Sequence, residues 1–280
     1  MRGVKAALVA AAVAGALVVG VALGDSSEAR SLIVQALALW DTSKRIPTLT
    51  QTDLDAKGLL ERVVAEYPNT EEAAEALRHL AFGHYYKGQA QEALAYWNRL
   101  FTEYPDSPQC AVAWLDKAEY HFKLGDYATA AECCTNIMTK FAATDDGREA
   151  LIERAFCKQA AQDFQGAADD LKQAAESDPS PERQAKAFYW LGYSHFRLAR
   201  YGDARTALER ILGDSSAPFA WWHDNARFLR AHCFYSEGDK ANALTALREV
   251  VAQNQDEAGP VCAEAMIKDL TASVHGGVAQ

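Results

Sequence analysis

The sequence predicts an all-α protein: a right-handed solenoid of about five helical hairpins, preceded by an N-terminal transmembrane or signal helix. The first observation is an alanine that recurs every 37 residues, with one more alanine 39 residues after the last of these: Ala56, Ala93, Ala130, Ala167, Ala204 and Ala243. The second is a small residue twelve positions before most of these alanines: Ala81, Ala118, Ala155, Gly192 and Ala231. A period of this length is typical of stacked helical arrays, whose usual role is to hold partners.

Residues 111–147 show how one unit is built. Apolar residues lie at helical spacing from 111 to 124, and Gly125-Asp126 then interrupts the pattern because glycine supplies the positive φ that ends a helix. A second helix is expected from Tyr127 to about Phe141. The small residues Ala118 and Ala130 allow the two antiparallel helices to approach closely. Neither helix buries its apolar stripe alone, so each hairpin needs the next one.

These features resemble the tetratricopeptide repeat (TPR) family. Residues Trp190-Leu191-Gly192-Tyr193 and 125–130 match the family pattern, and the resemblance extends over roughly residues 52 to 272. The period of 37 residues exceeds the family's usual length of about 34. Links such as Tyr67-Pro68-Asn69-Thr70 are similar to those of bacterial periplasmic members. The resemblance implies a protein-interaction role in the bacterial cell envelope.

Residues 1–24 form a separate segment, expected to be a signal peptide or a membrane anchor. Arg2 and Lys5 make a basic start, and residues 6–24 are uncharged and apolar. Nineteen residues of helix span roughly 28 Å, close to the thickness of a bilayer core. Ala22-Leu23-Gly24 also fits a cleavage site. With either outcome we expect residues 25–280 to be exported, and the membrane is a partner through residues 6–24 if they are not cleaved.

The rest of the chain divides by its patterns. We expect residues 25–51 to be a linker with one helix, from Glu28 to Trp40. The next helix, capped by Thr52 or Asp53, is interpreted as the second half of an incomplete first repeat. The solenoid is expected over 52–272, its last helix starting at Pro260 and covering the last hairpin. Residues 273–280 are expected to be a loose tail.

Charge excludes one class of partner. The net charge is −10, and it becomes −12 without Arg2 and Lys5. Such a surface repels phosphate backbones, and the sequence has no basic stripe with interleaved aromatic residues, so we expect no nucleic acid partner. We interpret the acidic pairs Glu71-Glu72 and Asp169-Asp170 as solvated.

The cysteines and histidines are interpreted as packing residues, and no metal site or cofactor is expected. The six cysteines contain no Cys-x-x-Cys motif, and a Cys133–Cys157 disulfide is the alternative in an exported chain. Three histidines share one repeat position, where they are expected to hydrogen-bond between helices: His84, His121 and His195. Catalytic motifs such as Gly-x-Ser-x-Gly and His-Glu-x-x-His are absent, so no catalytic residues are expected.

The candidate binding surface follows from the resemblance, which implies that the first helix of each hairpin lines a concave groove. Aromatic residues with the cationic Arg78, Lys186 and Arg197 suit an extended peptide or a partner helix. The alternative is that several of the aromatics only pack between hairpins. The predicted groove residues are Phe82, Tyr85, Tyr86, Phe122, Phe156, Tyr189, Tyr193, Phe196, Phe228 and Tyr235.

Together these patterns favour a non-enzymatic scaffold or adaptor in the bacterial periplasm, anchored in the inner membrane. Its expected partner is a protein: a peptide or helix bound in the groove. Two alternatives stay open. One is a fixed structural accessory subunit of a membrane protein complex, and the other is an envelope enzyme whose solenoid supports a small active site.

Overall fold

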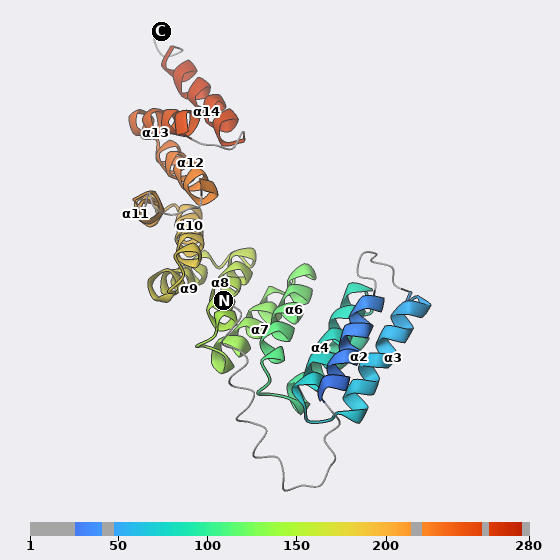
Figure 1. Ribbon diagram of the computed structural model, residues 1–280. Helices are drawn as coiled ribbons and strands as arrows, with labels where there is room; N and C mark the ends of the chain where they lie inside the picture. Colours follow the sequence, from blue (N-terminus) through green and yellow to red (C-terminus); the bar gives the residue numbers. More distant parts are fainter. Residues whose placement is uncertain (1–25, 41–47, 214–219, 254–257, 276–280) are drawn as a thin grey trace. The chain divides into compact units, whose positions relative to one another are not determined.

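A short turn with one residue at positive φ joins the two helices of most hairpins. The computed structural model describes residues 26–40, 48–213, 220–253 and 258–275, which form thirteen α-helices and no strands (Figure 1). The predicted all-α architecture of helical hairpins is confirmed in these residues. None of the described helices is long and apolar enough to cross a membrane, and the predicted signal or anchor segment, residues 1–24, lies outside them.

The turns share one backbone geometry at the 37-residue spacing. Gly88 and Gly125 have φ values of 77° and 78°, and Gln162 and Ala199 hold the same positive region at 64° and 56°. In each turn, the N–H of the residue that follows the positive-φ residue donates a hydrogen bond to the carbonyl five residues before it, as in Asp126 N to His121 O at 3.0 Å. This bond satisfies a carbonyl that the helix end leaves without a partner. The predicted turn at Gly125-Asp126 is confirmed.

The chain divides into two compact units, residues 1–109 and 110–280, and each is described by itself. The helices of the first unit are α2 (Ser26–Leu39), α3 (Gln51–Glu66), α4 (Glu71–Tyr86) and α5 (Ala90–Glu103). Their core contains Ala29, Ile33, Trp40, Leu60, Val63 and Leu80. Gly83 is needed here, because a β-carbon on it would lie 2.1 Å from the ring of Trp40.

Two expectations about the first unit are wrong. The interpretation of an incomplete first repeat fails because α2 packs against α3 in the same core and supplies the missing first helix. The expected caps Thr52 and Asp53 are wrong because α3 begins at Gln51 and Thr50 caps it. Asp53 instead lies in the first turn, where its carboxylate accepts a 2.8 Å hydrogen bond from the Thr50 backbone N–H.

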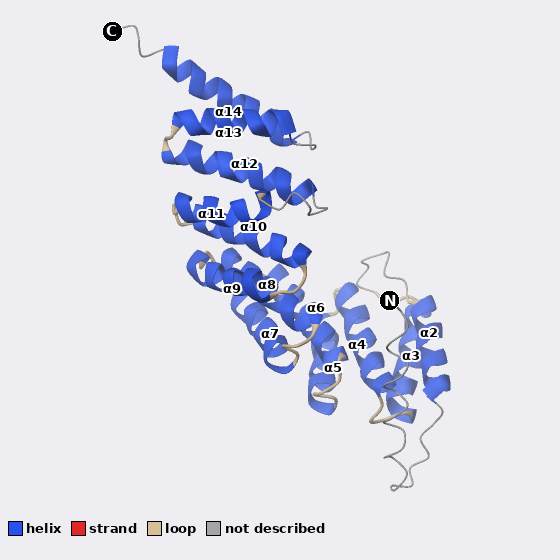
Figure 2. Ribbon diagram, turned by 60° about the vertical axis from the view of Figure 1, so that its left-hand side comes forward, coloured by secondary structure: helices blue, strands red, loops and turns tan. Residues whose placement is uncertain are grey.

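The second unit continues the same pattern of successive hairpins, which Figure 2 shows side by side from α7 to α14. The alanines of the 37-residue period are buried, with Ala130, Ala167 and Ala204 all 0% exposed. At Gly192 a β-carbon would lie 2.9 Å from the Leu208 side chain, so this position must stay small where α10 meets α11. The helices are α6 (Gln109–Lys123), α7 (Tyr127–Lys140), α8 (Asp145–Ala160), α9 (Phe164–Ser177), α10 (Pro181–Arg197), α11 (Tyr201–Leu212), α12 (Ala220–Glu237), α13 (Lys240–Gln253) and α14 (Ala258–His275).

The last helix packs as expected on the final hairpin. Ala263 and Leu270 of α14 join Leu247 and Val250 of α13 in one buried cluster. The helix begins at Ala258, two residues before the predicted start at Pro260. Of the expected loose tail, residues 276–280 lie outside the described residues.

Two of the acidic pairs are not fully solvated. Asp170 is only 5% exposed and pairs with Arg154 at 2.7 Å and with Lys158 at 2.7 Å. Glu72 is 7% exposed and pairs with Arg30 at 3.0 Å. The interpretation of these two carboxylates as solvated is therefore wrong: each is buried beside a cation on another helix, an arrangement that offsets the cost of burying a charge.

Candidate functional site

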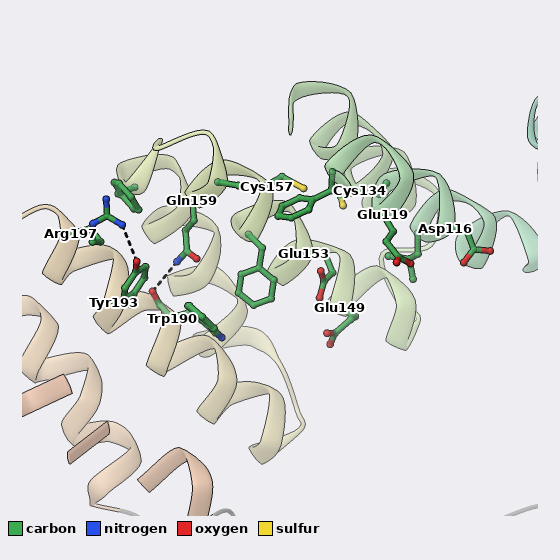
Figure 3. A pocket seen from close by; sticks show the side chains of 16 residues that line it. Asp116, Glu119, Cys134, Glu149, Glu153, Cys157, Gln159, Trp190, Tyr193 and Arg197 are labelled. Carbon is green, nitrogen blue, oxygen red and sulfur yellow. Dashed lines mark hydrogen bonds between the residues drawn. The ribbon is translucent and has the colours of Figure 1, made fainter. Parts of the chain in front are cut away.

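A cavity of about 760 Å³ lies in the second unit, lined by the first helices of three successive hairpins, α6, α8 and α10 (Figure 3). Each helix contributes residues three or four apart, which lie on one face of an α-helix. On α6 they are Leu115, Glu119 and Phe122, and the lining side chains of α8 and α10 follow the same spacing: Glu149, Glu153, Phe156 and Ala160, then Trp190, Tyr193 and Arg197.

Aromatic rings form the middle of the cavity. The Phe156 and Trp190 rings meet edge to face with their centroids 5.1 Å apart, and Trp190 meets Tyr193 in the same way at 5.6 Å. Edge-to-face contacts are a preferred geometry for aromatic pairs. The three rings therefore support one another and present a rigid apolar surface to the cavity.

One end of the cavity is cationic. The Arg197 guanidinium lies 4.2 Å from the centroid of the Phe164 ring and donates a 2.9 Å hydrogen bond to the Tyr193 hydroxyl. Beside it, Gln159 donates a 2.8 Å hydrogen bond to the Ser194 hydroxyl. Among the described residues, no carboxylate lies within ion-pair distance of Arg197. Its charge therefore faces the cavity without a counter-ion from those residues.

The other end is acidic, with the carboxylates of Asp116, Glu119, Glu149 and Glu153 gathered on α6 and α8 (Figure 3). Glu149 and Glu153 share one cation, because the Lys186 ammonium lies 2.5 Å from Glu149 and 3.4 Å from Glu153. Burial raises the pKa of the Glu153 carboxyl; Lys186 acts against this and the neighbouring Glu149 adds to it. Glu149 and Glu153 therefore share one positive charge between them.

Two cysteines form part of the cavity wall. Cys134 of α7 and Cys157 of α8 are 0% and 4% exposed, and their side chains lie next to each other. This contact and burial raise the pKa of Cys134, while the same contact lowers the pKa of Cys157. The structure thus places Cys134 beside Cys157, whereas the predicted alternative disulfide joins Cys157 to Cys133. Neither thiol is part of a disulfide in this structure.

The structure brings together three of the predicted groove residues, Phe122, Phe156 and Tyr193, together with the cation Arg197. Four others of the second unit lie in packing positions instead. Tyr189 contacts the rings of Trp190, Trp221 and Trp222, and Phe196 lies 4.8 Å from His232. Phe228 and Tyr235 pack against the C-terminal core, where the Tyr235 hydroxyl donates to Asp269 at 2.8 Å.

The remaining predicted residues, Phe82, Tyr85 and Tyr86, belong to the first unit and do not line this cavity. Tyr85 is only 6% exposed, because its ring packs 5.9 Å from that of Trp97 within the same hairpin. Phe82 contacts both tyrosine rings, at 6.3 and 6.1 Å. Arg78 donates a 2.8 Å hydrogen bond to Gln109.

The structure also shows cavity residues that the sequence did not single out, above all Trp190, Glu149 and Glu153. The two glutamates are four residues apart and lie one and two turns before Phe156, so the same helical register that selected Phe156 also places them in the cavity. Trp190 occupies the bulky position of the repeat pattern, where it served to mark the family resemblance and not a binding site.

Two of the three repeated histidines, His84 and His121, bond to the residue that caps the second helix of their hairpin, as expected, whereas the buried Nδ1 of His195 has no hydrogen-bond partner among the described residues. His84 bonds through Nδ1 to the Gln89 side chain at 2.6 Å, and His121 bonds to Asp126 at 3.1 Å. Burial lowers the pKa of His84, although its bond to Gln89 partly opposes this. In the described part of the chain, no group of three or more His, Cys, Asp or Glu side chains is placed to hold a metal ion.

Part of the chain is similar to a known protein family. The family model described as tetratricopeptide repeat matches residues 83–134 and 158–220. A search of curated proteins found no match.

Solved structures show the same fold. The crystal structure of MamA protein aligns with a TM-score of 0.54 and 15% sequence identity, covering 68% of this chain and 96% of that chain. A structure of nearly identical TPR-like repeats from Podosopora anserina aligns with a TM-score of 0.51 and 17% identity, covering 66% of this chain and 96% of that one. The structure of Naa15/Naa10 bound to HypK-THB aligns with a TM-score of 0.54 and 12% identity, covering 89% of this chain and 34% of that chain.

Proposed function

Because this chain carries tetratricopeptide repeats, we propose that it is a non-enzymatic adaptor that binds a segment of a protein partner in the cavity between α6, α8 and α10. Tetratricopeptide repeats generally mediate protein–protein interaction. The observation that carries the proposal is the common lining of the cavity by three successive first helices, with Phe122, Phe156, Trp190 and Tyr193 presented together. Aromatic side chains of this kind are the usual anchors of protein interfaces.

The polar groups of the cavity support binding rather than chemistry. A general acid or base works within hydrogen-bond reach of a nucleophile or an activated water. The carboxylates of Glu149 and Glu153 instead pair with the Lys186 ammonium, and the Cys157 thiol lies beside Cys134. The charges on Arg197, Glu149 and Glu153 thus suit recognition of a charged partner.

The bacterial cell envelope is the proposed location. Arg2 and Lys5 followed by nineteen uncharged residues support export of residues 25–280, with residues 6–24 either retained as an inner-membrane anchor or cleaved. The adaptor would then act in the periplasm.

Photocrosslinking in intact cells tests the binding site. A photoreactive amino acid in place of Phe122 should crosslink to a protein partner, which mass spectrometry would identify. Adding Trp190→Ala should reduce the crosslink about thirtyfold, the effect expected for a central interface aromatic. The matched control is Leu124→Ala, which removes an exposed apolar side chain that does not line the cavity. Equal crosslinking in the Trp190 and Leu124 variants would exclude the cavity as the binding site.

A second candidate function is a fixed structural subunit of a membrane protein complex. The observation in its favour is on α2, where Val34 and Leu37 are 66% and 44% exposed and lie three residues apart on one helix. A fixed subunit copurifies stoichiometrically in mild detergent and loses its partners on Val34→Asp, whereas an adaptor exchanges its partner and is sensitive to Trp190→Ala.

A further inference from the structure

The two ends of the cavity differ in charge, and this difference indicates the chemistry of its occupant. Arg197 lies at one end, while Glu119, Glu149 and Glu153 lie at the other, with Trp190 between them (Figure 3). The Phe156 ring packs against that of Trp190. A bound segment must therefore cover an apolar middle and meet opposite charges at its two ends.

At the acidic end, two carboxylates share one cation. Glu149 and Glu153 both pair with the single ammonium of Lys186, while Glu119 pairs with Lys123. Burial and the neighbouring Glu149 raise the pKa of Glu153, which is the response expected of a carboxylate short of positive charge. A cation from a ligand would lie favourably here.

The span of the cavity sets the length of the segment. Three neighbouring helices with axes about 8–10 Å apart span roughly 16–20 Å, which equals about six residues of extended chain. An extended segment of about six residues therefore covers the part of the cavity lined by α6, α8 and α10.

We propose that the cavity binds an extended peptide segment that carries a lysine or arginine at one end and an aspartate or glutamate about six residues away, with apolar side chains between them. The cationic residue lies at Glu149 and Glu153, and the acidic residue accepts hydrogen bonds from Arg197. The inference rests on the proposed function, since it names the chemistry of the segment that the adaptor binds.

The test is a peptide array probed with the full chain in lipid nanodiscs, with empty nanodiscs as the blank. The positions between the charges are randomised over Ser, Thr, Leu and Phe, equally in every class. The classes differ only in the end residues: Lys and Glu six residues apart in both chain directions, Lys and Glu adjacent, Gln replacing Lys, and Gln replacing Glu. We expect the class with the two charges six residues apart to bind about tenfold more tightly than either Gln class. Equal binding by all classes, or a preference for adjacent charges, would overturn the inference.

Protein variants identify which end reads which charge. Glu149→Gln with Glu153→Gln should abolish the preference for Lys over Gln, and Arg197→Gln should abolish the preference for Glu over Gln. Lys186→Gln should have the opposite effect, strengthening the preference for Lys, because it removes the cation that competes with the ligand. A reduced preference for Lys in the Lys186 variant would contradict the assignment.

The outcome also separates this inference from the proposed function. If Trp190→Ala abolishes binding of every class while the charge variants change nothing, the cavity binds peptides and the charge assignment is wrong. If neither Trp190→Ala nor the charge variants change binding, the cavity is not the binding site, and both proposals fail.

Discussion

Asp53 and Lys87 are charged side chains that lie almost entirely inside the first unit, 0% and 1% exposed. Their charged groups are 3.0 Å apart. Burial acts to raise the pKa of Asp53, but the hydrogen bonds from Thr50 and the Lys87 ammonium outweigh it and hold the pKa below its ordinary value. The pair links the first turn of α3 to the end of α4, so it fixes how these two helices meet.

We predict that Lys87→Met destabilises the first unit by about 3–5 kcal/mol, because it leaves a buried carboxylate without its cation. Chemical denaturation followed by circular dichroism measures this. The double variant Asp53→Asn with Lys87→Met should recover part of the loss, since neither charge then remains buried. A loss below about 1 kcal/mol in the single variant would show that the pair contributes no more than a surface ion pair.

The same pair predicts a dependence on pH. The folded pKa of Asp53 is lower than its unfolded value of about 3.9, so its contribution is complete above that pH and is lost as the pH falls through the folded value. The free energy of unfolding of the wild type should therefore fall more steeply below about pH 4 than that of Asp53→Asn. Parallel acid titrations of both proteins would contradict this assignment.

Cys134 and Cys157 are predicted to form a disulfide on oxidation. Their side chains already lie next to each other in the cavity wall, and the lowered pKa of Cys157 favours the thiolate that reacts. Treatment with diamide removes two protons and two electrons from the pair, forms the S–S bond and reduces the diamide to its hydrazine. Mass spectrometry of tryptic peptides should find the Cys134–Cys157 crosslink in the wild type and in Cys133→Ser. Its presence in Cys134→Ser through Cys133 would contradict the pairing.

Asp170 shows why single residues were the hardest part to predict. Next to the exposed Asp169 it read as half of a solvated acidic pair, yet it is buried beside Arg154, sixteen residues away along the chain. Burial of a charge depends on a partner from another helix, which sequence spacing alone does not supply. The acidic end of the cavity escaped prediction for a similar reason, since glutamates at helical spacing are usually found on solvated faces.

The turns are the most regular elements of the chain. Gly88 and Gly125 hold a positive φ at little cost, whereas Gln162 and Ala199 adopt the same conformation with a β-carbon. The sequence predicted the turn position from the register at all four sites, because the alanine period fixes it. It did not predict that a non-glycine residue would keep the left-handed conformation.

We predict that Gln162→Gly and Ala199→Gly each stabilise the second unit by up to about 1 kcal/mol, as the relief of strain exceeds the added entropy of the unfolded chain. Thermal unfolding measures the effect. Gly125→Ala is the matched opposite change: no atom lies within 4 Å of its added β-carbon, so any loss of stability comes from the backbone alone. If Gln162→Gly and Ala199→Gly both destabilise the second unit, the backbone at these two positions is not strained.

The first hairpin, α2 with α3, could not be predicted from the sequence because the link between its two helices breaks the 37-residue period. In the later hairpins a small residue lies twelve positions before the periodic alanine, but twelve before Ala56 is Lys44, which lies between α2 and α3. The link from Trp40 to Thr50 is longer than the short turns elsewhere, so the register could not extend back to α2. What reveals this hairpin is a contact distant in sequence, the ring of Trp40 over Gly83.

At the scale of the whole chain, the repeat period was sufficient to predict an all-α array, because the hairpins after the first share the same small residues and the same turn. The proposed location of the protein depends on residues 1–24. The prediction at this scale therefore concerns their role in export.

Alkaline phosphatase fused after residue 280 should be active in cells, because we expect the C-terminal part to be exported and this reporter folds only outside the cytoplasm. Removing residues 1–24 should abolish the activity. Mass spectrometry of the mature N-terminus then distinguishes a retained anchor from a cleaved signal. Activity that persists without residues 1–24 would show that they do not direct export.

The equivalence of the turns has a consequence for how the gene can be shortened. Gly125 and Gln162 hold the same backbone conformation, and Asp126 and Asp163, which follow them, cap α7 and α9 through the same side-chain bond. Excising residues 126–162, a length of 37, joins Gly125 to Asp163 and brings Ala118 opposite Ala167 in place of Ala130. The shortened protein should still unfold cooperatively, with one hairpin fewer. An excision three residues shorter should instead rotate the apolar stripe of every following helix away from the helix that it packs against. Because the spliced chain loses α8 with Glu149, Glu153 and Phe156, it keeps its architecture and gives up its binding cavity, so this one deletion measures stacking and recognition as separate properties.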